Sequence, residues 1–177
     1  RDLLHSQAPE VPLENFIVEP APRGTAPALG LAAVALRARD PQAVMACLTA
    51  DHFIADEARF RDVLSAAREM ALKDYLVTLG IAPTFASTGF GYIQRGAEVG
   101  DVRGLKVYRA ARFKEKPART EAEAMLADGQ HSWNSGMFVW RTADIQAEIA
   151  RHLPQHHRNL AAAAAAWGTP AFDAALR

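Results

Sequence analysis

Strand-length apolar runs alternate with helix-length patterns along this sequence, and this alternation constrains the fold more than any other feature. The apolar runs at residues 44–48 and 75–81 are separated by a segment that begins at Asp56. Apolar residues recur in this segment at the spacing of an amphipathic helix: Phe60, Val63, Leu64, Ala67 and Ala71. Such alternation is the sequence form of βαβ units. It predicts an α/β fold with a Rossmann-like, mainly parallel mixed sheet flanked by helices.

The remaining segments extend this pattern toward both ends. We expect a short strand at residues 15–18, a helix that Thr25 caps and that runs to about residue 39, and strands at 92–94, 107–113 and 136–141. Thr120 and Glu123 form a capping box for a helix that ends at Gly129, and Thr142 caps the next helix. The tail is helical and rich in alanine. No linker divides the chain, so we expect residues 1–177 to form a single domain.

Composition limits the classes of function. The 20 Lys and Arg balance the 20 Asp and Glu, so the chain lacks the excess of positive charge that is typical of proteins that bind nucleic acids or anionic membranes. No apolar stretch approaches the roughly 18 residues of a membrane span. The single cysteine, Cys47, permits no internal disulfide and is most simply a small buried apolar residue. We therefore expect a cytoplasmic protein whose partners are neither nucleic acid nor membrane.

Polar residues that directly follow apolar runs are the candidates for chemistry, because ligands of open α/β sheets bind beyond the carboxyl ends of the strands. Asp51 follows the run at 44–48 and is a hard oxygen ligand suited to a magnesium ion shared with phosphates. The alternative is that Asp51 only caps the turn before the next helix.

Glu115 and Lys116 follow the run at 107–113 and precede Pro117, which fixes the backbone. In an extended segment these neighbours point in opposite directions. A carboxylate can accept from sugar hydroxyls and an ammonium can neutralise a phosphate, so the pair suits a phosphorylated sugar. The alternative is a solvated edge of mixed charge. Asn134 is a good partner for sugar hydroxyls, and Gly136 allows close approach of the backbone.

Taken in order, five segments resemble the sugar nucleotidyltransferase family, and specifically its mannose-1-phosphate guanylyltransferase branch. They cover roughly residues 10–155 and read Glu-Pro-Ala-Pro-Arg-Gly-Thr-Ala-Pro-Ala from Glu19, Ala-Asp-His from Ala50, Gly-Ile-Ala-Pro-Thr from Gly80 with Thr-Gly-Phe-Gly-Tyr-Ile from Thr88, Phe-Lys-Glu-Lys-Pro from Phe113, and Trp-Asn-Ser-Gly-Met-Phe from Trp133. Each is weak alone, but together, in family order and at family-like spacing, they are specific.

The resemblance implies a reaction in which an oxygen of mannose-1-phosphate attacks the α-phosphorus of GTP, giving GDP-mannose and releasing pyrophosphate. The protein would align two anions and stabilise their charge. By similarity, Asp51 is a magnesium ligand and a catalytic residue, and Lys116 is catalytic and binds the sugar phosphate. Glu115, Asn134 and Gly136 are expected around the sugar, and Gly91 would let the backbone touch it.

The resemblance also implies nucleotide-binding roles for Glu19, Gly24 and Thr25. Guanine presents two adjacent donors, N1–H and the 2-amino group, which one carboxylate at Glu19 could accept together. Gly24 stands where this branch usually has Asn, and glycine suits a backbone that lies flat against a base. Thr49 replaces a usual Pro and Phe90 a usual Tyr.

Two parts of the family pattern have no counterpart in these residues. The glycine-rich loop that cradles the triphosphate is expected before Arg1, and a second magnesium-binding Asp is expected past Arg177. We therefore expect a domain that is incomplete at both ends and a fragment that is inactive alone. Three alternatives remain: another hexose-1-phosphate, another base, or a non-catalytic relative that binds nucleotide sugars. A homodimer is also possible.

Overall fold

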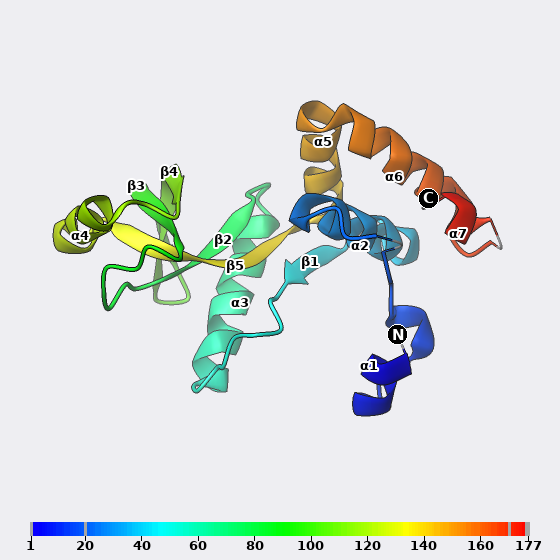
Figure 1. The fold of residues 1–177 in the computed structure, drawn as a ribbon, viewed down its shortest axis with the longest axis horizontal. Helices are drawn as coiled ribbons and strands as arrows, with labels where there is room; N and C mark the ends of the chain where they lie inside the picture. The colour runs from blue at the N-terminus through cyan, green and yellow to red at the C-terminus, as the bar shows by residue number, and fades with distance from the viewer. Residues whose placement is uncertain (1, 20, 170, 176–177) are drawn as a thin grey trace. The chain divides into compact units, whose positions relative to one another are not determined.

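The computed structural model describes residues 2–19, 21–169 and 171–175. These residues form two compact units. The helical unit combines the described residues up to Ala43 with those from Thr142 onward, and the sheet unit is the continuous segment Val44–Arg141. Figure 1 shows the elements of both units in chain order.

The helical unit is built around α2 (Thr25–Arg39), which packs against α5 (Thr142–His152) and α6 (Pro154–Ala166). Its other helices are α1 (Asp2–Gln7), η1 (Leu13–Asn15) and α7 (Phe172–Ala175), and α7 contacts α6. Leu31 and Val34 of α2 are buried, as are Ile149 of α5 and Ala163 of α6. In Figure 1, α2 in blue lies beside α5 and α6 in orange.

The strand predicted at residues 15–18 is wrong. The structure has η1 there, followed by a stretch without regular structure that reaches Glu19. Every regular element of this unit that the structure describes is a helix, so residues 15–18 have no neighbouring strand with which to form ladder hydrogen bonds.

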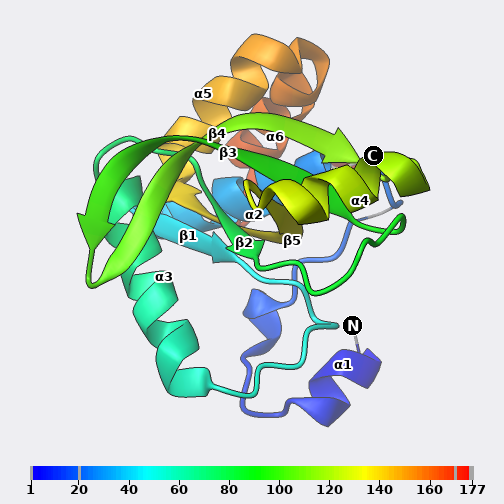
Figure 2. The same cartoon turned by 90° about the vertical axis from the view of Figure 1, so that its left-hand side faces the viewer.

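The sheet unit contains β1 (Val44–Cys47), α3 (Glu57–Ala71), β2 (Val77–Ile81), β3 (Gly91–Val102), β4 (Leu105–Glu115), α4 (Arg119–Asp128) and β5 (His131–Arg141). The five strands form one sheet with the order β1-β5-β3-β4, and β2 also pairs with β5. The predicted α/β fold with a sheet flanked by helices is thus confirmed. Figure 2 shows β3 and β4, in green, running side by side as a long hairpin.

The expectation of a mainly parallel sheet is wrong, because every strand pairing among the described residues is antiparallel. The predicted β1-α3-β2 unit exists, and its two strands run in the same direction. They are not neighbours, however, because β5 lies between them: Val139 pairs with Ala46 of β1 and with Val77 of β2. β3 and β4 are joined by a two-residue turn, and a connection this short can only join antiparallel strands.

Two predicted helix caps are also displaced. The N-cap of α4 is Ala118 instead of Thr120, because the chain turns into the helix directly after the buried Pro117. Thr142 is the first residue of α5, and its hydroxyl donates to the carbonyl oxygen of Ala43 instead of capping. The cap of α3 is Asp56, where that helix was predicted to begin, and its carboxylate accepts from the backbone N–H of Arg59.

Burial alternates along β5 and separates the two sides of this strand. Trp133, Ser135, Met137 and Val139 are buried, while Asn134 and Gly136 between them are only half-buried. On the buried side, Trp133 packs against Ala122 of α4, and Val139 packs against Ala67 and Ala71 of α3. Because successive strand residues face opposite sides of a sheet, Asn134 and Gly136 belong to the side that α3 and α4 leave open.

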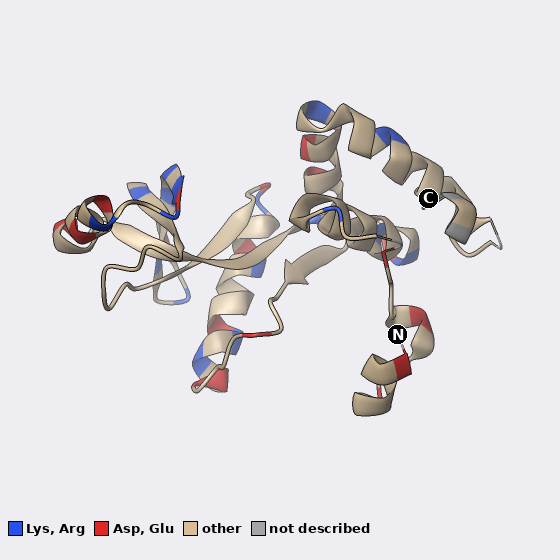
Figure 3. Ribbon diagram, in the orientation of Figure 1, with Lys and Arg blue, Asp and Glu red and all other residues tan. Residues whose placement is uncertain are grey.

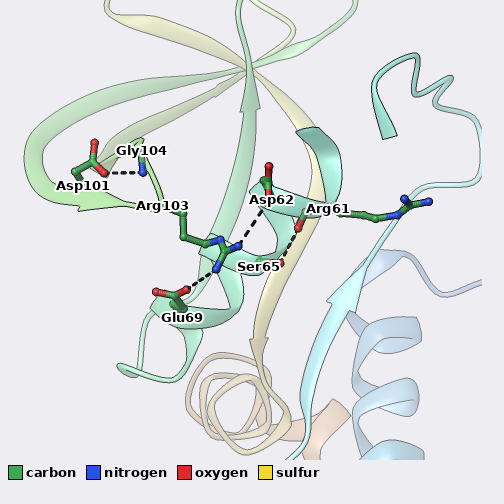
Figure 4. Close-up of polar contacts among 7 residues, drawn as sticks. All are labelled: Arg61, Asp62, Ser65, Glu69, Asp101, Arg103 and Gly104. Carbon is green, nitrogen blue, oxygen red and sulfur yellow. Dashed lines mark hydrogen bonds and ion pairs between the residues drawn. The ribbon is translucent and has the colours of Figure 1, made fainter. Parts of the chain in front are cut away.

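The tip of the β3–β4 hairpin forms ion pairs with α3 (Figure 4). Arg103 and Gly104 both have positive φ, at 57° and 73°, as in the tight turns that match the twist of antiparallel strands. The Asp101 carboxylate accepts from the Gly104 N–H at 2.8 Å. The Arg103 guanidinium lies 3.7 Å from Asp62 and 3.4 Å from Glu69, both on α3. These groups are about half exposed, so each ion pair stabilises the hairpin by about 1 kcal/mol or less.

Charged side chains of both signs occur together on α3 and on α4 (Figure 3), as the balanced composition predicts. None of the helices that the structure describes is long and apolar enough to cross a membrane. Cys47 is half-buried, although it was predicted to be buried, and this partial burial raises the pKa of its thiol to about 11, so the side chain is neutral at physiological pH.

Candidate active site

Gly91, Glu115 and Asn134 meet on the side of the sheet that α3 and α4 leave open, and we call these three residues the Gly91 cluster. Gly91 and Glu115 are register partners in β3 and β4. A Cβ atom built on Gly91 would lie 2.6 Å from Oε2 of Glu115 and 3.5 Å from Cβ of Asn134. Three residues from three different strands, all predicted to bind the sugar, therefore lie close together around the α-carbon of Gly91.

Glu115 supplies the acceptor of this cluster. It is the last residue of β4, its side chain is exposed to solvent, and its carboxylate extends over the α-carbon of Gly91. An ionised carboxylate can only accept hydrogen bonds. Because Gly91 has no side chain, the Glu115 carboxylate can lie over its α-carbon, where it is exposed to a ligand that donates to it.

Lys116 has a strained backbone. Its φ is +43°, a region that residues with a side chain rarely occupy. Its N–H donates to the carbonyl oxygen of Phe90 at 3.2 Å, and Pro117 behind it is buried. The prediction that the side chains of Glu115 and Lys116 point in opposite directions holds only for extended backbone. Lys116 has left-handed backbone, so the prediction does not apply to it. Backbone strain of this kind concentrates at functional sites, and here it fixes where the exposed lysine leaves the strand.

Asn134 and Gly136 form one local structure. Gly136 has a φ of +71°, which favours glycine, and its N–H donates to Oδ1 of Asn134 at 3.2 Å. A Cβ on Gly136 would lie 3.4 Å from Cγ2 of Thr49, in the loop that follows β1. Asp51 lies two residues further along this loop, so the loop that carries Asp51 touches β5 beside Asn134.

Asp51 is exposed, and its carboxylate makes no hydrogen bond or ion pair with any residue that the structure describes. The alternative interpretation, that Asp51 caps the turn before the next helix, has no hydrogen bond to support it among the described residues, and the cap of that helix is Asp56. In residues 2–19, 21–169 and 171–175, no three His, Cys, Asp or Glu side chains gather as a metal centre. Asp51 is thus a single available carboxylate.

The three residues predicted to bind the nucleotide, Glu19, Gly24 and Thr25, belong to the helical unit, whereas the Gly91 cluster, Lys116 and Asp51 belong to the sheet unit. Gly24 is the N-cap of α2, and Thr25 is its first residue, so the prediction that Thr25 caps this helix is wrong. The φ of +93° at Gly24 explains the shift, because an N-cap needs non-helical backbone and glycine adopts this angle at low cost. Glu19 is half-buried.

Sequence reasoning missed two hydroxyl side chains that shape the site. The Thr78 hydroxyl in β2 donates to Oδ1 of Asn134 at 3.4 Å. The buried Ser135 hydroxyl donates to the carbonyl oxygen of Leu79 at 2.7 Å and accepts from the N–H of Met137 at 3.1 Å. The available signal was that Thr78 and Ser135 are polar residues within strands of mainly apolar residues. This signal does not reveal the groups to which their hydroxyls bind.

Replacing Ser135 by alanine is expected to lower the free energy of unfolding by about 1 to 3 kcal/mol, because it removes the partner of two backbone groups in a buried position. Urea denaturation of the variant and the unmodified chain measures this difference. Ser132→Ala is the matched control, since Ser132 is on the same strand and its hydroxyl has no hydrogen-bond partner among the described residues. Equal stability of the two variants would contradict the assigned role of Ser135.

Comparison with known proteins places this geometry in a family. The model of the nucleotidyl transferase family matches residues 3–166, and the chain belongs to that family. Among curated relatives, the mannose-1-phosphate guanylyltransferase of Klebsiella pneumoniae is 44% identical over 140 residues, which cover 79% of this chain and 30% of that protein. The enzyme of the same name from Sinorhizobium fredii is 39% identical over 158 residues, covering 87% of this chain and 30% of the relative.

Two solved structures share the fold of this chain. A structure described as mannose-1-phosphate geranyltransferase, from Thermus thermophilus, matches with a TM-score of 0.77 and 33% identity over 90% of this chain and 45% of that one. A second, described as mannose-6-phosphate isomerase from Helicobacter pylori, has a TM-score of 0.70 and 28% identity over 85% of this chain and 54% of the other. The chain spans about 30% of the length of the curated relatives it matches.

Proposed function

We propose that this chain carries the sugar-phosphate side of a mannose-1-phosphate guanylyltransferase, which converts GTP and mannose-1-phosphate to GDP-mannose and pyrophosphate. The observation that carries the proposal is that Glu115 and Asn134 both lie close to the α-carbon of Gly91, with Lys116 next in the chain after Glu115. The names of the relatives support the choice of guanosine and mannose. Membership of the family supports the coarser statement that the substrates are a nucleoside triphosphate and a sugar phosphate.

In the proposed reaction, a phosphate oxygen of mannose-1-phosphate attacks the α-phosphorus of GTP, and the bond to the departing pyrophosphate breaks. No covalent bond to the protein forms. Glu115 accepts from a sugar hydroxyl, and Asn134 binds beside it over Gly91. Lys116 neutralises charge on the sugar phosphate. The protein accelerates the reaction by holding two anions in line and by compensating their repulsion with fixed charge.

Asp51 fits a magnesium ion as one ligand, since its carboxylate is exposed and free of protein partners among the described residues. Magnesium is commonly bound by one or two carboxylates together with substrate phosphates and water. When bound, the ion would neutralise phosphate charge. Asp51 would supply one carboxylate to such an ion, and no group of three His, Cys, Asp or Glu gathers elsewhere among the described residues.

The experiment that tests the proposed function is release of pyrophosphate by the full-length protein that contains these residues, with magnesium, GTP and mannose-1-phosphate. Parallel reactions replace GTP by UTP or ATP, and mannose-1-phosphate by glucose-1-phosphate. Release that requires GTP and mannose-1-phosphate supports the proposal. Faster release with another pair would assign a different sugar or base. Selective binding of GDP-mannose without turnover in any reaction would favour a non-catalytic relative.

A cytoplasmic location and a homodimer stay predictions.

Replacing Glu19 by glutamine is expected to reduce the preference for guanine by about 1 to 3 kcal/mol, because the amide cannot accept from two adjacent donors as a carboxylate does. The ratio of kcat/KM for GTP to that for ATP, compared between the variant and the unmodified protein, measures the loss. The KM for mannose-1-phosphate is the internal control and should stay constant. An undiminished preference for GTP would remove Glu19 from base recognition.

A further inference from the structure

The side-chain oxygen of Asn134 faces inward. The Gly136 N–H, 3.2 Å from Oδ1, can only donate, so it requires an acceptor and fixes which end of the amide faces it. The Thr78 hydroxyl lies 3.4 Å from the same oxygen. Both internal contacts therefore use Oδ1. None of the residues that the structure describes accepts a hydrogen bond from Nδ2.

Thr78 is well placed to hold this oxygen. It lies on β2, which borders β5 along one edge, whereas Gly91 lies on β3 along the other edge. Asn134 is thus flanked by the Thr78 hydroxyl on one side and by the open α-carbon of Gly91 on the other. Thr78 is half-buried and branched at Cβ, so its side chain has little rotational freedom and its hydroxyl keeps its position.

We propose that Thr78 is a positioning residue, which holds the Asn134 amide so that its NH₂ group donates to an oxygen of the sugar phosphate while Glu115 accepts from a hydroxyl. This inference rests on the proposed function. It gives the Gly91 cluster a fixed polarity, with a donor at Asn134 and an acceptor at Glu115. A ligand hydroxyl that lies over Gly91 can satisfy both groups at once, because it carries one donor and two lone pairs.

The first test needs no substrate. In the ligand-free full chain, the side-chain NH₂ signals of Asn134 are identified in ¹⁵N-correlated NMR spectra by their disappearance in Asn134→Ala. Thr78→Val, which keeps the shape and removes the hydroxyl, should shift both proton signals, and Thr78→Ser should restore them. Thr120→Val, an exposed residue on α4, makes the same chemical change away from the site and should leave them in place. Unmoved signals in Thr78→Val would overturn the proposal.

The second test measures affinity for mannose-1-phosphate by calorimetry. Thr78→Val should weaken binding by about 3- to 10-fold, as for loss of one hydrogen-bonding partner, whereas the affinity for GTP should change less than about twofold. Thr78→Ser should bind as the unmodified chain does. Should Thr78→Val destabilise the sheet, Thr78→Ala is the second variant for the same comparison.

A double-mutant cycle separates a positioning role from a merely structural one. If Thr78 acts through Asn134, Thr78→Val should cause no further loss of affinity in a chain that already carries Asn134→Ala. A full additional loss in that background, or an equal loss of GTP affinity, would overturn the proposal. If the unmodified chain fails to bind mannose-1-phosphate, the proposed function fails instead, and the NMR comparison still decides whether Thr78 orients Asn134.

Discussion

Replacing Lys116 by alanine in the full-length protein is expected to lower turnover by about two to three orders of magnitude, as for loss of one preorganised charge contact to the transition state. The strained backbone at φ +43° and the hydrogen bond to Phe90 hold this residue at the end of β4, beside Glu115. The side chain is exposed, so its loss should leave the free energy of unfolding almost unchanged. Turnover with saturating GTP and mannose-1-phosphate is the measurement.

Lys114 offers the matched control for this variant. It lies two residues earlier in β4, and its ammonium pairs with Glu121 of α4 at 3.0 Å, on the covered side of the sheet. Lys114→Ala removes the same charge from the same strand but should keep turnover within about threefold, because only a surface ion pair is lost. A loss below tenfold in Lys116→Ala would remove Lys116 from the site.

Replacing Gly91 by alanine is expected to raise the KM for mannose-1-phosphate by about 10- to 100-fold, since displacement of binding groups by about 1 Å can cost that much. The added Cβ would lie 2.6 Å from Oε2 of Glu115, which forces the carboxylate away from the position in which it would accept from the sugar hydroxyl. The KM for GTP should stay within about twofold, because the site that is altered serves the sugar phosphate.

The same variant should cost little stability. The atom that clashes is the end of a flexible, exposed side chain, which can rotate away without moving the sheet. Gly89→Ala is the control, because a Cβ there would meet only Ser87 Oγ at 3.8 Å, an ordinary contact. A variant of Gly91 that is unstable, or one that binds mannose-1-phosphate normally, would contradict the assigned geometry of the cluster.

The elements themselves could be predicted because they depend on local patterns. The apolar stripe after Asp56 became α3, the run at residues 44–48 became β1, and Gly129 ended α4 in the left-handed conformation that glycine favours. The site residues of the sheet unit could be proposed for a similar reason: they follow or precede apolar runs, where side chains reach the edge of a sheet, and the family motifs mark them.

The pairing of strands could not be predicted in the same way. Nothing near residues 44–48 or 77–81 in the sequence indicates that a strand starting at His131 will lie between them. The N-caps at Gly24 and Ala118 were also missed. The first residue of each helix depends on the backbone conformation of the segment before it, and for α4 this segment ends at the buried Pro117.

The sequence by itself determined the α/β class, most helices and strands, and which residue types could meet a phosphorylated sugar, because periodicity and side-chain chemistry are local properties. Only the tertiary structure decided that the sheet is antiparallel, that Glu115 and Asn134 lie close to Gly91, and that the Thr78 hydroxyl donates to the Asn134 oxygen. Those contacts join residues up to 56 positions apart, and their register is set by hydrogen bonds between strands that no local pattern encodes.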